Sequence, residues 1–135
     1  MDSPSQTSAT APTGAPLPED SLENLNRRLL RFARERDWEQ FHSPKNLVMA
    51  LAGECGELLE HFQWLTPEQS ASLSPDKREE VAAEMADILI YLIRLSERLG
   101  VDLIAAANEK TARNEARYPV ERTRGDARRA SEYED

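Results

Sequence analysis

Two pairs of carboxylates share a three-residue spacing within segments whose apolar residues repeat as on a helix. The first pair is Glu54 and Glu57, and the second is Glu84 and Asp87. At about 100° of rotation per residue, the first member of each pair lies roughly 80° from the centre of its helix's apolar arc. Both pairs are therefore predicted on the flank of a buried face and not on the open surface.

If these two helices pack together, the four carboxylates converge at one rim of the core. Two like charges 4 Å apart repel by about 4 kcal/mol at an effective dielectric of about 20, so the cluster requires cations. Carboxylate oxygens without cysteine or paired histidines suit Mg²⁺, with Mn²⁺ as the alternative, and not structural zinc. The competing interpretation is coincidence, because the chain has 25 acidic residues and such pairs also occur on solvated helices.

A second group with chemical potential is the stripe Lys110, Asn114 and Arg117, spaced i, i+4 and i+7. It follows the line of Leu103 and Ala107, so we expect it to be turned partly inward. Lysine and arginine commonly hold phosphate, and together with metal ions they would form a polyphosphate clamp. The alternative is an ion-paired stripe on the surface.

Aromatic side chains form a third group, which stands at predicted helix ends or on the acidic flank. They can act as stacking walls for a flat base. For the two tryptophans the alternative is a hydrophobic cap over a bundle end, and for the histidine a structural role. The candidates for a base and sugar pocket are Trp38, His42, Trp64 and Tyr91.

The elements that position these residues are all predicted to be helices. Capping residues start them at Ser21, Ser43-Pro44, Thr66-Pro67, Ser74-Pro75 and Asp102. The predicted spans are 22–36, a helix from 44 through the acidic pair, a short turn from 67, 75–99 with Gly100 as its stop, and 103–117. No segment alternates with period two, so the fold class is all-α, a four-helix bundle-like arrangement.

The stretch GECGELLEHFQW, residues 53–64, has two glycines inside a predicted helix. Each costs roughly 0.5–1 kcal/mol relative to alanine there. We interpret Gly53 and Gly56 as room for a closely packed neighbour, within the chain or across a subunit contact. Cys55 is expected to face the core as a small apolar residue.

Composition divides the chain into three parts. Residues 1–20 are rich in Pro, Ser, Thr and Ala and are predicted to be a disordered tail. Residues 21–118 form the folded domain. Residues 119–135 are densely charged, and we expect a tail that is loosely ordered or lies on a neighbouring subunit.

The charge balance limits the partners. A net charge of −8 and a pI near 4.9 argue against binding a nucleic acid polymer, which needs a basic surface. A single cysteine rules out an intramolecular disulfide, and no apolar run is long enough to span a bilayer. We expect a cytoplasmic protein without a membrane or nucleic acid partner.

The combination Glu54-x-x-Glu57, Glu84-x-x-Asp87 and Lys110-x-x-x-Asn114-x-x-Arg117-Tyr118-Pro119 resembles the MazG-like all-α nucleotide pyrophosphohydrolases. The stretches RDWEQFHSPKNL and GECGELLEHFQW resemble the dCTP pyrophosphatase branch most. The resemblance covers residues 22–119. Relatives of the animal type carry a histidine where this chain has Leu29, which bears on base preference.

The resemblance implies Mg²⁺-dependent hydrolysis of a nucleoside triphosphate, dCTP or modified dCTP first, to the monophosphate and pyrophosphate, as a house-cleaning step in nucleotide-pool control. It implies self-association as a dimer or a dimer-of-dimers tetramer. The four carboxylates would hold the metal, Glu54 or Glu57 would orient the attacking water, the 110–117 stripe would hold phosphates, and the aromatic set would shape the base pocket.

Two other functions compete with this one. A di-iron carboxylate bundle needs two Glu-x-x-His pairs, and the chain has only Glu39-x-x-His42. A non-catalytic nucleotide-binding or helical interaction module would release no pyrophosphate when metal and nucleotide are added.

Overall fold

The computed structural model describes residues 20–132, and every regular element in this range is helical. The four main helices are α1 (Leu22–Glu35), α2 (Pro44–Phe62), α4 (Pro75–Leu99) and α5 (Leu103–Arg117). Short helical turns lie between and after them: η1 (Glu39–Phe41), α3 (Pro67–Ser70), α6 (Val120–Thr123) and η2 (Ala130–Glu132). The all-α prediction is confirmed. The tail predicted at residues 1–20 lies almost wholly outside the described residues.

Local capping explains why the helices start where they do. The hydroxyl of Ser43 accepts the Asn46 N–H at 3.2 Å, and the Ser74 hydroxyl accepts the Lys77 N–H at 3.3 Å. In both helices a proline at the first position needs no hydrogen-bond acceptor. Gly100 ends α4 with a φ of 65°, the left-handed conformation that glycine adopts without strain. The predicted helix limits are therefore correct to within a residue where they were stated.

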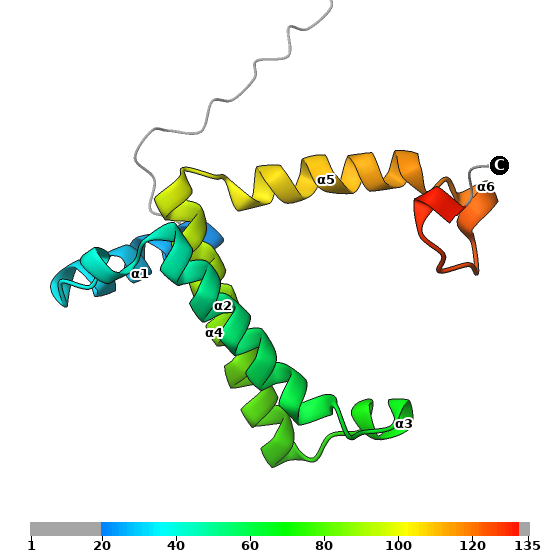
Figure 1. The fold of residues 1–135 in the computed structure, drawn as a ribbon, viewed down its shortest axis with the longest axis horizontal. Helices are drawn as coiled ribbons and strands as arrows, with labels where there is room; N and C mark the ends of the chain where they lie inside the picture. Colours follow the sequence, from blue (N-terminus) through cyan, green and yellow to red (C-terminus); the bar gives the residue numbers. More distant parts are fainter. Residues whose placement is uncertain (1–19, 133–135) are drawn as a thin grey trace, which may run out of the picture.

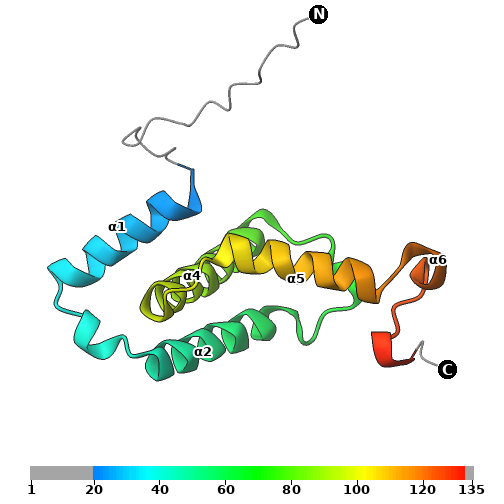
Figure 2. The same ribbon diagram turned by 90° about the horizontal axis from the view of Figure 1, so that it is seen from above.

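The body of the molecule is an antiparallel pair, α2 and α4, which lie side by side along their lengths (Figure 1). Helix α1 crosses α4 near the end where α2 begins (Figure 1), and Figure 2 shows it on the side of α4 away from α2. The buried apolar side chains of this body are few, namely Ala33, Leu47, Val81 and Ile93. They fix the rotation of α2 and α4 about their axes, and this rotation decides which side chains meet at the acidic flank.

Several apolar residues of α2 and α4 are exposed. Met85 is 58% and Leu99 56% exposed, and Cys55 is also on the surface. The apolar positions of α2 and α4 outnumber those that one antiparallel contact can cover, because each helix buries only the stripe that faces the other. The expectation that Cys55 faces the core is therefore wrong for the single chain.

Helix α5 leaves the end of α4 and extends away from the paired helices (Figure 1). None of its residues is buried, and Ile104 is 57% exposed. The charged segment after Pro119 forms the two short helical turns α6 and η2, and the expectation that it is loosely ordered or lies on a neighbouring subunit stays a prediction. Its closing contact is the Ala130 N–H, which donates to the Tyr118 hydroxyl at 3.1 Å.

Candidate functional site

Three of the four predicted metal-holding carboxylates meet where α2 packs on α4. Glu54 comes from α2, and Glu84 and Asp87 come from successive turns of α4. One ligand oxygen from each lies within 4.8 Å of the others. The fourth residue, Glu57, is exposed and interacts with Glu54 without belonging to this set of three. Glu54, Glu84 and Asp87 thus lie on the facing flanks where helix rotation predicts them, whereas Glu57, predicted off the open surface, is exposed.

The electrostatics of this cluster suit a divalent cation. Burial, followed by the neighbouring carboxyls of Glu57, Asp87 and Glu84, raises the pKa of Glu54 to about 7. Two buried oxygens, Oε2 of Glu54 and Oε2 of Glu84, have no hydrogen-bond partner. Buried acceptors without donors are costly, and a hard cation satisfies them. The residues present therefore fit Mg²⁺ or Mn²⁺.

His61 closes one side of the cluster. Its Nε2 lies 3.8 Å from Glu84 Oε1, and its Nδ1 lies 3.9 Å from Glu80 Oε2. The imidazole is half-buried between α2 and α4. It can therefore help to position the Glu84 carboxylate.

An aromatic cavity of about 250 Å³ opens beside the same carboxylates. Glu54 and Asp87 form part of its wall, and three of the predicted base-pocket residues, Trp38, His42 and Tyr91, also line it. Phe32 packs edge-to-face on Trp38 with ring centroids 5.6 Å apart, and Trp38 lies similarly against His42 at 6.4 Å. The cavity can therefore hold a flat ring within reach of the acidic cluster.

Arg94 is the lining residue that sequence reasoning missed. It is only 2% exposed, and its Nη1 forms an ion pair with Glu97 Oε2 at 3.0 Å. Its Nε donates to His42 Nδ1 at 3.4 Å. Burial, followed by the Arg94 charge, lowers the pKa of His42, which favours the neutral imidazole. The available signal was the spacing of Asp87, Tyr91 and Arg94, which share one face of α4.

Trp64 does not join the cavity of its own chain. It follows the end of α2 that is remote from η1, and it is 86% exposed. Neither it nor its neighbours line the aromatic cavity. Within one chain, Trp64 and the other three candidates are thus separated along the length of α2.

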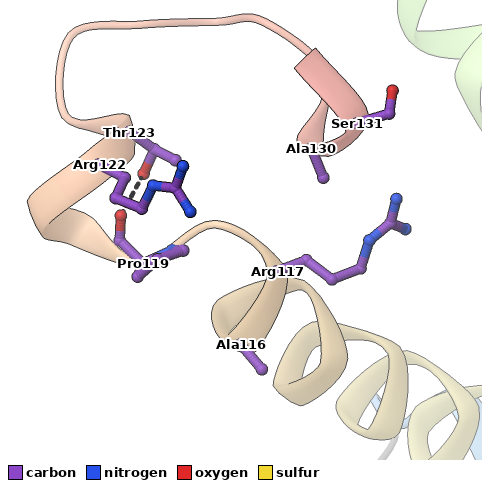
Figure 3. Close-up of a pocket in the computed structure, with 7 residues that line it drawn as sticks. All are labelled: Ala116, Arg117, Pro119, Arg122, Thr123, Ala130 and Ser131. Carbon is purple, nitrogen blue, oxygen red and sulfur yellow. Dashed lines mark hydrogen bonds between the residues drawn. The ribbon is translucent and has the colours of Figure 1, made fainter. Parts of the chain in front are cut away.

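The predicted phosphate-holding residues are also separated from the carboxylates. Lys110, Asn114 and Arg117 are exposed on α5, so the expectation that this stripe turns inward is wrong for the single chain. Arg117 lines a different cavity, of about 390 Å³, which Figure 3 shows between the end of α5 and the returning segment. Arg122 and Ser131 lie on the same cavity wall.

Comparison with known proteins now identifies the family. The model of the MazG-like family matches residues 50–133, which is more than half of the chain. The chain belongs to the MazG-like family. The matched region of this MazG-like chain includes the carboxylate cluster and the whole of α5. Among the described residues, no helix is both long enough and apolar enough to cross a membrane.

The relatives of this MazG-like chain are pyrophosphatases by name. It is 46% identical over 112 residues to dCTP pyrophosphatase 1 of Rattus norvegicus and 45% identical over 117 residues to that of Homo sapiens. These matches cover 82% and 85% of the chain but only 66% and 69% of the relatives, so about a third of each relative has no counterpart in the match. The crystal structure of a pyrophosphatase from Archaeoglobus fulgidus DSM 4304 superposes with a TM-score of 0.69 at 36% identity, covering 73% of this chain and 92% of that one.

Proposed function

We propose that this MazG-like protein hydrolyses a deoxynucleoside triphosphate to the monophosphate and pyrophosphate, with dCTP or 5-modified dCTP as its first substrate. The observation that carries the proposal is the contact between an aromatic cavity and a carboxylate cluster that has two unsatisfied oxygens. A base in the cavity would direct its phosphates toward the carboxylates. The names of the vertebrate relatives support dCTP as the choice of nucleotide.

The metal would be held by Glu54, Glu84 and Asp87, with Glu57 beside them. Bound Mg²⁺ supplies positive charge that neutralises phosphate oxygens and makes the phosphorus more electrophilic. The protein's own part is to orient water with Glu54 or Glu57 toward the α-phosphorus.

The site as proposed needs a second copy of the chain. The 110–117 stripe and Trp64 are remote from the cluster in one chain, and exposed apolar residues lie along α2 and α4, namely Val48, Met49, Leu59, Met85 and Leu89. An exposed apolar face of this kind is typical of a subunit contact. We infer a dimer, or a tetramer built from two dimers, in which α5 of one subunit brings Lys110, Asn114 and Arg117 to the phosphates of a neighbouring site.

The decisive experiment separates the products of each canonical and 5-modified dNTP after incubation with Mg²⁺. We expect equimolar monophosphate and pyrophosphate, with dCTP or a 5-modified dCTP turned over most efficiently. Orthophosphate as the product would contradict attack at the α-phosphorus. Nucleotide binding without any product would favour the alternative, a non-catalytic nucleotide-binding module. Light scattering on the same sample measures the molar mass and so distinguishes a dimer from a tetramer. A cytoplasmic role in nucleotide-pool control stays a prediction.

A further inference from the structure

Arg94 is a buried cation in the wall of the aromatic cavity. The residue is 2% exposed, and it lines the cavity together with Trp38 and Tyr91. Arginine is rarely buried to this degree unless its donors are paired. The partners of its three nitrogens therefore indicate what the residue does.

Two of these nitrogens are paired within the chain and the third is not. Nε donates to His42 Nδ1, and Nη1 donates to Glu97 Oε2. Nη2 is buried and has no hydrogen-bond partner. A buried N–H of a charged group without an acceptor is costly, and because Arg94 lines the cavity, a ligand bound there can supply the acceptor.

The missing partner has to be an acceptor, because a guanidinium has only N–H donors. The Glu97 carboxylate already balances the Arg94 charge at 3.0 Å. Glu54 and Asp87 line the same cavity and would repel an anionic ligand group placed beside them without a cation. A neutral carbonyl oxygen on a flat ring fits these conditions better than a phosphate does.

We propose that Arg94 Nη2 donates a hydrogen bond to the 2-carbonyl oxygen of a pyrimidine base held in the aromatic cavity. This makes Arg94 a specificity-determining residue, and the inference rests on the proposed nucleotide hydrolysis. Adenine has no ring carbonyl and would leave Nη2 unsatisfied. The hydrogen bond from Nε to His42 Nδ1 also fixes the imidazole as the Nε2–H tautomer, which holds its ring in place at the cavity wall.

The test compares dCTP with 2-thio-dCTP, in which a sulfur atom replaces the acceptor oxygen. We expect the protein to prefer dCTP by about 10- to 100-fold in kcat/KM, as for the loss of a charge-assisted hydrogen bond. The difference should fall on KM, with kcat little changed, because this contact is made equally before and during the reaction. Equal kcat/KM values for the two nucleotides would overturn the proposal without any variant.

The variant Arg94→Met separates hydrogen bonding from the larger size of sulfur. This variant should have a higher KM for dCTP, and its preference for dCTP over 2-thio-dCTP in kcat/KM should fall to about threefold or less. Arg98→Met is the matched control, because Arg98 is exposed on the same helix and does not line the cavity, and it should keep the full preference. If a folded Arg94→Met protein keeps the full preference, the 2-carbonyl is not read by Arg94.

Failure of the proposed function would be visible separately. If the wild-type protein releases no pyrophosphate from any dNTP, the hydrolysis proposal falls. The Arg94 proposal is then decided by equilibrium binding of the same two nucleotides, followed through tryptophan fluorescence. Tighter binding of dCTP that is lost in Arg94→Met would support it. Equal binding of the two nucleotides, or no binding of either, would overturn it.

Discussion

The aromatic cavity with its carboxylate cluster is formed within one chain, whereas helix α5, called the arm below, exposes its stripe of Lys110, Asn114 and Arg117. The cavity draws on α1, η1, α2 and α4, and its carboxylates and aromatic rings are already within contact of one another. The arm carries an equally regular stripe of functional side chains, yet none of its residues is buried. The same helix-face reasoning predicted both groups, and it placed only the first correctly, because a helix face acquires an inside only from the helix packed on it.

The largest expected effect on activity comes from removing a carboxylate of the cluster. Asp87→Ala should lower kcat for dCTP by about 1,000-fold, since loss of metal ligation removes several kcal/mol of transition-state stabilisation. Circular dichroism should show unchanged helical content. Glu79→Ala, an exposed position on α4 outside the cluster, is the control and should stay active. Activity retained in Asp87→Ala would refute the metal assignment.

A substitution in the α5 stripe should have the next largest effect on activity, because we propose that α5 contributes to the site of a neighbouring subunit. Arg117→Ala should raise KM by about 10- to 100-fold through loss of a charge-assisted contact to phosphate. Mixed dimers isolated with two tags, one chain carrying Asp87→Ala and the other Arg117→Ala, should regain about half of the wild-type activity, because one of the two sites is then intact. Mixed dimers as inactive as the parents would place α5 at its own chain's carboxylates.

The raised pKa of Glu54 predicts a pH-dependent stability that metal should remove. Between the ordinary value near 4.5 and about 7, the folded protein binds the Glu54 proton more tightly than the unfolded chain does. The free energy of unfolding of the metal-free protein therefore falls as pH rises through this window.

Thermal melts of the metal-free wild type and Glu54→Gln measure this contribution. The melting temperature of the variant relative to the wild type should be higher at pH 8 than at pH 5. Added Mg²⁺ should raise the wild-type value at pH 8 and have less effect on the variant. Glu60→Gln, at an exposed position on the same helix, is the control, and a similar pH trend there would contradict assignment to Glu54.

The smallest expected effect is that of replacing Gly56 of α2, on stability and self-association. A Cβ built at Gly53 or Gly56 meets nothing within 4 Å, so within the described chain neither glycine makes room for a neighbour. What remains of the earlier interpretation is a subunit contact. Gly56→Ala should stabilise the isolated fold by about 0.5–1 kcal/mol while weakening self-association. Melts at several protein concentrations separate the two, and unchanged association would leave Gly56 without a packing role.

Much of the local structure was accessible from the sequence because its causes are local. The serine-proline starts and the Gly100 stop depend on hydrogen bonds within three or four residues, so the helix limits were predicted closely. Glu54, Glu84 and Asp87 were also found from rotation alone, because α2 and α4 are long and each has a clear apolar arc. Arg94 was not found, because arginine on a helix is usually a surface residue, and only the tertiary structure shows that it is buried and paired with His42.

The sequence by itself determined the helices, their limits and the flank on which each acidic pair stands, since backbone geometry and local capping decide these features. The tertiary structure alone decided that Arg94 lies inside the cavity with an unpaired donor, and that α5 departs from the body with its phosphate-type stripe uncovered. The physical reason is that burial and electrostatic pairing depend on which helix lies opposite, and neither is encoded in the periodicity of one segment.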